Sequence, residues 1–148
     1  MRIRVVEVLA TLKRAGAERM AVSLAAGLDP RRFETSVISL YDAFPGGFED
    51  ELAARGIPVT HLGKRRGLDL RMIPRLVRAF QRLRPAVVHS HSYLLRYTWP
   101  AALMAREGVV VHTVHNVADR EVDALGRVIH RLAFHEDVVP VAVAEEVA

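Results

Sequence analysis

Strand-like and helix-like segments alternate along the whole chain, and this alternation constrains the fold more than any other feature. Short apolar runs rich in β-branched residues predict strands at 3–9, 33–40, 57–62, 86–90, 109–114 and 138–143. The segments between them have helical periodicity, which predicts helices at 17–28, 48–55, 69–83, 122–134 and within 94–107. Such alternation favours an α/β fold, a Rossmann-like doubly wound parallel sheet of about six strands with helices on both faces.

Individual residues make the predictions for three of these helices more specific. In the first, one apolar stripe is predicted to be buried, comprising Ala17, Met20, Ala21, Leu24, Ala25 and Leu28. Asp69 is the expected N-cap of the third helix. Pro100 predicts that the fourth helix either begins near Thr98 or kinks there. A further helix is expected to begin at Glu145.

Composition excludes several classes of protein. The 148 residues include no cysteine, so disulfides, thiolate nucleophiles and cysteine zinc sites are excluded. No apolar run approaches the roughly 18 residues needed to cross a bilayer. We therefore expect a cytoplasmic protein, with the inner face of the membrane as a second location. The net charge of +4 suits anionic partners, although an arginine-rich genome would produce the same excess.

Polar residues gather where an open α/β sheet binds ligands, outside the carboxyl ends of its strands. If the strand order is 3-2-1-4-5, the loops at 11–16, 91–97 and 115–120 lie at that edge. Four of the seven histidines end strands or lie close to an end: His89, His91, His112 and His115. The first turn has neither G-x-G-x-x-G nor a P-loop motif, which disfavours nicotinamide cofactors and P-loop chemistry. It does lead into a helix N-terminus, a natural site for an anion.

Read together, these loops resemble glycosyltransferase family 4. Residues 14–19, Arg-Ala-Gly-Ala-Glu-Arg, are similar to the G-G-A-E-R turn of that family. The resemblance is collinear over essentially the whole chain and continues through residues 28–34, 52–59, 84–91, 111–116 and 141–145. Ala15 replaces the first glycine of the turn, and Ala144 replaces the usual serine.

The resemblance implies a two-domain GT-B enzyme that transfers a sugar, with retention, from a nucleotide-sugar to a glycan or lipid-linked acceptor. Residues 1–148 would form its N-terminal, acceptor-side domain. The C-terminal domain, which grips the nucleotide with a basic residue and an E-x7-E pair, would be absent. The fragment alone is then expected to be inactive. The nucleotide-sugar is a co-substrate, and no cofactor is expected in this domain.

Resemblance also assigns roles to individual residues. His115 matches the histidine that the family places beside the transferred sugar, where it would position substrate and stabilise charge. The backbone at Gly16 and Ala17 would face the donor diphosphate, unless Gly16 serves only the turn. Candidate contacts in the acceptor cleft are Lys13, Arg14, His91, Tyr93 and Asn116. The assignment requires Gly16, His91 and His115 to open onto one cleft wall.

Two further patterns have competing interpretations. His89 and His91 share one face of their strand, but no acidic residue stands at ligand spacing nearby, so we expect no metal and a structural role for His89. Arginines recur along one face of the third helix behind a basic loop. They form either a solvated face or a peripheral membrane contact through Lys64, Arg65, Arg66, Arg71, Arg75 and Arg78. Few aromatic residues interleave with these cations, which disfavours nucleic-acid binding.

Two other functions remain open at this point. A stand-alone Rossmann-like module that binds a phosphorylated ligand without catalysis would have the same sheet. A sugar-nucleotide epimerase would have the same two-lobed architecture, and Glu18 and Asp119 are the obvious carboxylates for it.

Overall fold

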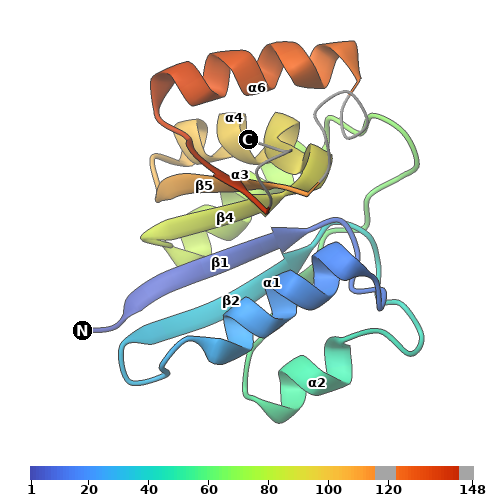
Figure 1. The fold of residues 1–148 in the computed structure, drawn as a ribbon, viewed down its shortest axis with the longest axis vertical. Coiled ribbons are helices and arrows are strands. Elements are labelled where there is room, and N and C mark those ends of the chain that lie inside the picture. The colour runs from blue at the N-terminus through green and yellow to red at the C-terminus, as the bar shows by residue number, and fades with distance from the viewer. Residues whose placement is uncertain (116–122, 144–148) are drawn as a thin grey trace.

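The computed structural model describes residues 1–115 and 123–143. Its sheet has six parallel strands in the order β3-β2-β1-β4-β5-β6 (Figure 1). This order confirms the predicted Rossmann arrangement and makes β1 and β4 neighbours at the point where strand order reverses. The strands are β1 (Ile3–Leu9), β2 (Phe33–Ser39), β3 (Val59–His61), β4 (Val87–His91), β5 (Val109–Val114) and β6 (Val139–Ala142).

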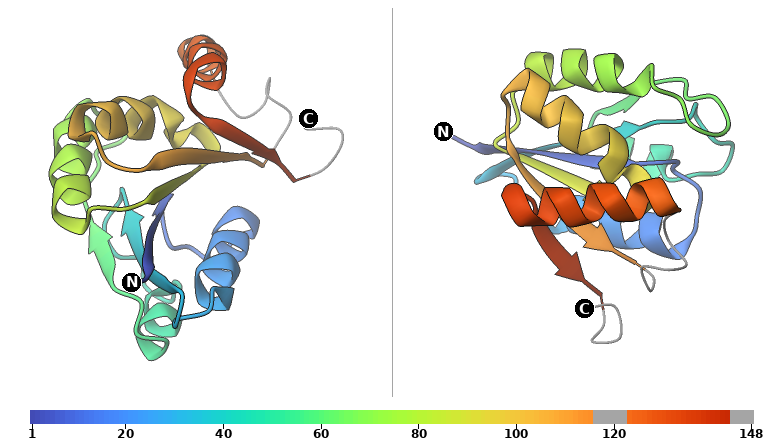
Figure 2. Two further views of the ribbon diagram at one scale, coloured as in Figure 1. Left: turned by 90° about the vertical axis from the view of Figure 1, so that its left-hand side faces the viewer. Right: turned by 90° about the horizontal axis from the view of Figure 1, so that it is seen from above.

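Helices cover both faces of the sheet, as predicted. Helix α1 lies over β1 and β2 on one face, whereas α3 and α4 lie on the opposite face, with α6 next to α4 (Figures 1 and 2). The helices are α1 (Gly16–Gly27), α2 (Glu49–Ala54), α3 (Met72–Leu83), α4 (Leu95–Ala105) and α6 (Ala124–Glu136), with a short 3-10 helix η1 (Ser92–Leu94) before α4. The helix expected from Glu145 lies outside the described residues.

The period-two pattern of β1 divides its side chains between two cores. Val6 and Val8 pack into the larger core beneath α3 and α4, with Phe80 at its centre. Leu9 packs into the smaller core beneath α1, where Ala21 is fully buried. Odd-numbered residues of β1 therefore face α1, and this places the Glu7 side chain on the α1 face of the sheet.

Some local predictions are wrong. Asp69 does not cap α3, because its carboxylate is held by the backbone N–H groups of Arg65 and Arg71 and by the Arg71 guanidinium. This local turn ends before the helix, which begins at Met72. Helix α4 begins at Leu95 with Pro100 inside it, so the start near Thr98 is also wrong.

The buried face of α1 also differs slightly from prediction. Leu24 remains 42% exposed, whereas Val22 is buried beside Ala21 and Ala25. Helix α1 covers only part of its face of the sheet, so the buried stripe of the helix is narrower than its apolar stripe.

Candidate active site

A cluster of polar side chains lies on the α1 face, at the carboxyl ends of β1, β4 and β5. Strand register pairs Glu7 with His89 and His91 with Thr113. Since side chains two residues apart share a face, His91 follows His89 toward the strand end, and His115 continues the same face beyond β5. The structure therefore confirms that His89 and His91 share a face, and it brings His115 beside them.

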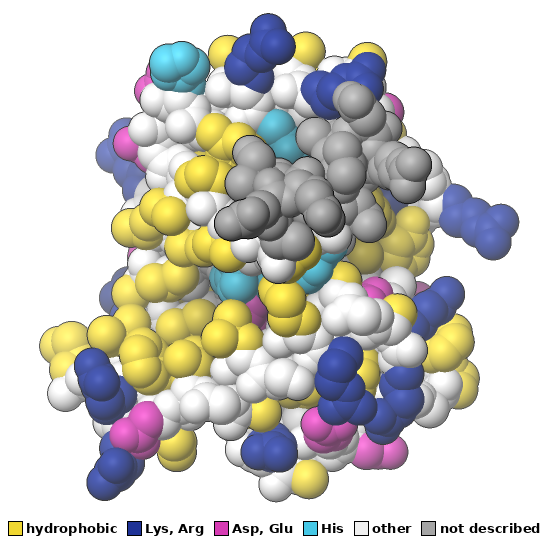
Figure 3. Space-filling model, viewed as in Figure 1, with side chains coloured by type: hydrophobic (Ala, Val, Ile, Leu, Met, Phe, Trp, Pro, Cys, Tyr) yellow, Lys and Arg dark blue, Asp and Glu magenta, His cyan; other side chains and the backbone are white. Residues whose placement is uncertain are grey.

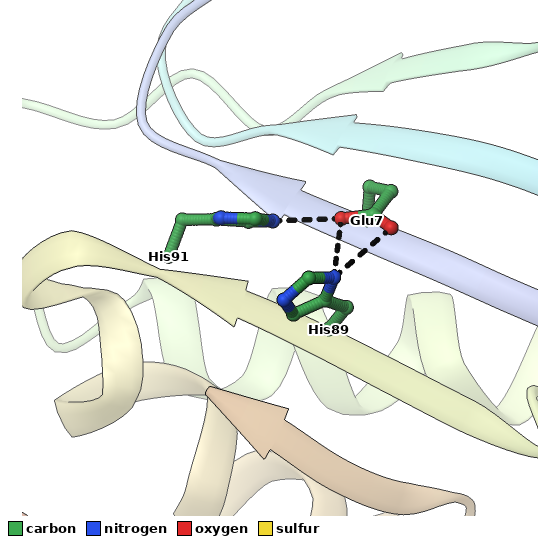
Figure 4. Close-up of side chains that lie close together, drawn as sticks. All are labelled: Glu7, His89 and His91. Atoms are coloured by element: carbon green, nitrogen blue, oxygen red, sulfur yellow. Dashed lines mark hydrogen bonds and ion pairs between the residues drawn. The ribbon is translucent and has the colours of Figure 1, made fainter. Parts of the chain in front are cut away.

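Glu7 is the centre of this cluster and is 1% exposed (Figure 4). His91 Nε2 lies 2.7 Å from Glu7 Oε2, and His89 Nδ1 lies 3.1 Å from Oε1. The second nitrogen of each ring is also engaged. His89 Nε2 lies 2.7 Å from Thr113 Oγ1, and His91 Nδ1 lies 3.0 Å from His115 Nε2.

The electrostatics of the cluster favour an ionised Glu7 beside uncharged His91 and His115. Burial by itself would raise the pKa of Glu7, but hydrogen bonds and charge from His89 and His91 outweigh it and lower that pKa. Burial lowers the pKa of His91, and it lowers the pKa of His115 to about 4, with help from His91 and His89. At neutral pH the site therefore holds an ionised Glu7, while His91 and His115 are uncharged.

Glu7 is the residue of this cluster that sequence reasoning missed. The expectation that no acidic residue stands at ligand distance from the histidines is wrong. Glu7 is 82 residues from His89 in sequence but adjacent to it across the β1–β4 pair. Ligand atoms of Glu7, His89 and His91 all lie within 4.8 Å of one another. The available signal was a single acid within residues 5–9, the buried and otherwise apolar part of β1.

The turn before α1 lies at the same edge of the sheet, because it follows the carboxyl end of β1. Gly16 is the first residue of α1 and does not have a positive φ. A Cβ added there would meet no heavy atom within 4 Å among the described residues. Local geometry therefore does not explain the glycine, which argues against a role in the turn alone. Its neighbour Ala17 is half-buried in the first turn of the helix.

The predicted acceptor contacts do not form one group. His91 lies in the Glu7 cluster, whereas Arg14 is directed to the neighbouring loop, where its Nε donates to the Gly46 carbonyl at 3.0 Å. Lys13 Nζ lies 4.8 Å from the Phe44 ring centroid, on that same loop. Tyr93 lines a separate hollow together with Tyr41, Lys64, Gly67, Leu68, Arg96, Tyr97 and Asp123. Asn116 lies outside the described residues.

The basic residues proposed for membrane contact are also divided by the structure. Lys64 is only 7% exposed, and its ammonium donates to Tyr41 Oη at 3.2 Å and to the carbonyls of Arg65 and Gly67. A surface role for Lys64 is therefore wrong. Arg71 is paired with Asp69, and the Arg75 guanidinium donates to the Leu62 carbonyl. The exposed members are Arg65, Arg66 and Arg78.

On the surface, histidine side chains appear near the middle of the α1 face, between hydrophobic groups and flanking basic ones (Figure 3). Among the described residues, no helix is both long and apolar enough to cross a membrane.

Comparison with known proteins identifies both a family and a fold. The model of Glycosyltransferase Family 4 matches residues 14–138. No curated protein matches the sequence significantly. Similar solved structures include the lipopolysaccharide outer core galactosyltransferase WaaB in its apo form, with a TM-score of 0.70 and 9% sequence identity. The match covers 98% of this chain and 40% of the WaaB chain.

Two further structures share the fold. One is MurG of Acinetobacter baumannii, with a TM-score of 0.64 and 17% identity, and the match covers 94% of this chain and 45% of the MurG chain. The other is a UDP-N-acetylglucosamine 2-epimerase, with a TM-score of 0.63 and 14% identity, and the match covers 99% of this chain and 43% of the epimerase chain. The chain thus spans less than half the length of each of these structures. At such identities the similarity establishes the fold alone.

Proposed function

Because the chain belongs to glycosyltransferase family 4, we propose that it is the N-terminal, acceptor-side domain of a retaining GT-B enzyme. That enzyme would transfer a sugar from a nucleotide-sugar to a carbohydrate or lipid-linked acceptor, with a second domain holding most of the nucleotide. The observation that carries this proposal is the convergence of Gly16, His91 and His115 at one edge of the sheet, where open α/β folds bind ligands.

His115 is the residue that we place at the reaction centre. Its lowered pKa, about 4 and caused mainly by burial, keeps the ring neutral at physiological pH. A neutral imidazole can hydrogen-bond a sugar hydroxyl and stabilise charge that develops as the glycosidic bond breaks. The N-terminus of α1, at Gly16 and Ala17, offers first-turn backbone N–H groups and a positive dipole end to the donor diphosphate.

Replacing His115 with alanine in the full-length enzyme is expected to lower kcat by about 10²- to 10⁴-fold, the range for a group acting on the reacting atoms. The measurement is transfer from a panel of nucleotide-sugars to candidate acceptors. His135→Ala is the matched control, because His135 is exposed on α6. If His115→Ala turned over as fast as wild type, this assignment would be wrong.

Gly16→Ala separates a donor contact from a role in folding. Because the added methyl group meets nothing within 4 Å, the free energy of unfolding should stay within about 1 kcal/mol of wild type. A methyl group facing the diphosphate should raise the KM for the donor. Urea unfolding and steady-state kinetics on the same preparation test both halves. A clear loss of stability with an unchanged donor KM would assign Gly16 to the fold.

Similarity to the 2-epimerase structure keeps epimerisation as the second candidate. Of its two candidate carboxylates, Glu18 accepts a hydrogen bond from the Thr11 hydroxyl at 3.2 Å, and Asp119 lies outside the described residues. Incubating the full-length enzyme with nucleotide-sugars in the absence of acceptor distinguishes the two. Conversion to an epimer would favour the second candidate, and transfer only when acceptor is added would favour the first.

Peripheral contact with an anionic membrane stays a prediction for the exposed cations Arg65, Arg66 and Arg78.

A further inference from the structure

Glu7 is a charged group in the middle of a parallel sheet, and this is the most unusual feature of the site. A carboxylate that is 1% exposed is stable only if hydrogen bonds replace the water it has lost. The histidines of β4 lie against it, with ring nitrogens at 2.7 and 3.1 Å from its oxygens. The cluster therefore has an acceptor at its centre and N–H donors around it.

This arrangement fixes where the proton of His91 must lie. An ionised carboxylate only accepts hydrogen bonds, so His91 Nε2 carries the proton that points to Glu7. In the neutral ring, Nδ1 is then an acceptor, and it lies 3.0 Å from His115 Nε2. His115 must therefore donate from Nε2, which leaves its Nδ1 as the ring nitrogen without a proton. By the same argument His89 carries a proton on Nδ1, which faces Glu7, while its Nε2 contacts Thr113, whose hydroxyl can donate or accept.

We propose that Glu7 is a positioning residue that acts through His91, fixing the tautomer and the orientation of His115 at the carboxyl edge of the sheet. The order Glu7–His91–His115 is set by geometry, and only the role of His115 in sugar transfer rests on the proposed function. His89 and Thr113 brace the second side of the carboxylate, since His89 Nδ1 is also 3.0 Å from Oε2. Glu7 itself does not touch the substrate.

The same three side chains, Glu7, His89 and His91, could instead bind a metal ion. The two arrangements differ in which ring nitrogen of His91 carries the proton. A metal on Nε2 would place the proton on Nδ1, and His115 Nε2 would then accept. The observed 2.7 Å separation between His91 Nε2 and Glu7 Oε2 matches a charge-assisted hydrogen bond. The three side chains therefore form a hydrogen-bonded network.

Tautomer assignment by ¹⁵N NMR on histidine-labelled protein of this chain tests the geometry without any activity. We expect Nε2–H signals for both His91 and His115 at pH 7, unchanged by one equivalent of zinc chloride. A His91 ring protonated at Nδ1, or zinc-dependent shifts of His89 and His91, would overturn the proposal. Failure of the full-length wild-type enzyme to transfer sugar would refute the proposed function and leave this result standing.

Kinetics of the full-length enzyme test whether the network positions His115. Glu7→Gln keeps the size of the side chain but removes one acceptor and the charge. His91→Asn keeps an amide near the His91 Nδ1 position but detaches it from Glu7. Each is expected to lower kcat by about 10- to 100-fold, as for other groups that orient a working histidine, with little change in donor KM. An unchanged kcat in either folded variant would overturn the proposal.

Discussion

Glu7→Ala is expected to lower the free energy of unfolding by about 2–5 kcal/mol, because two buried histidine N–H groups each lose their acceptor at a cost of roughly 1–3 kcal/mol. The substitution deprives His89 and His91 of their shared acceptor and leaves a cavity where the side chain was. Both rings are held on the opposite side by Thr113 and His115, so they cannot easily turn toward water.

Urea unfolding followed by circular dichroism measures this loss. Glu34→Ala is the matched control, because Glu34 lies on the adjacent strand β2 with its side chain 56% exposed, where it pairs with Arg2. That pair should contribute no more than about 1 kcal/mol. If the two variants lost equal stability, Glu7 would not be the buried anchor described above.

A second large effect is expected from acid, and it centres on His112. This ring is fully buried on the opposite face of the sheet, packed against His130 and Phe134. Neither of its nitrogens has a hydrogen-bond partner within the part of the chain that the structure describes. Burial, with smaller contributions from neighbouring histidines, lowers the pKa of His112 to about 2.

The sign of the pH effect follows from that direction. The unfolded chain binds a proton at the ordinary histidine pKa, whereas the folded protein does not until near pH 2, so acid favours unfolding. His112 should contribute its full stabilisation above about pH 6.5 and lose up to about 1.4 kcal/mol per pH unit below it. The depressed pKa of Glu7 adds a loss of the same sign, which begins only where an unfolded glutamate takes up its proton and therefore at lower pH than the loss from His112.

His112→Phe should remove this dependence. It replaces a buried ring that has two unpaired nitrogens with an apolar ring of similar shape, and we expect about 1–3 kcal/mol of stabilisation at pH 7. Unfolding free energies at pH 7, 6, 5 and 4 should diverge between the variant and wild type as pH falls. Parallel curves, or a destabilised variant at pH 7, would show that the His112 nitrogens have partners in solution.

The sequence predicts the fold well because the central strands β1, β4 and β5 are largely buried. In β1 and β5 the β-branched runs match the observed strands, Ile3–Leu9 and Val109–Val114, and the other elements differ mainly at their ends. Those ends depend on interactions that periodicity does not contain. Asp69, for example, has the composition of a helix cap but closes a turn of its own with Arg65 and Arg71.

The site was predictable in its histidines but not in its carboxylate. His91 and His115 are both near strand ends, and the carboxyl ends of parallel strands meet at one edge, so their proximity follows from chain order. The Glu7 contact depends on β1 lying beside β4, a pairing across 82 residues that local pattern cannot reveal. The burial of Lys64 was missed for a related reason. Its ammonium is buried only because the Tyr41 hydroxyl and two loop carbonyls meet around it in the folded chain.

The strand origin of Glu7, His89 and His91 has a consequence for the energetics of substrate binding. Side chains anchored in a paired sheet lose their freedom during folding, so little further ordering is required when a ligand arrives. The ring of His115 would then meet each substrate already aligned, and closing the cleft would change only the water around it. In such an enzyme the conformational entropy of this ring is lost when the protein folds, and it is not lost again in each catalytic cycle.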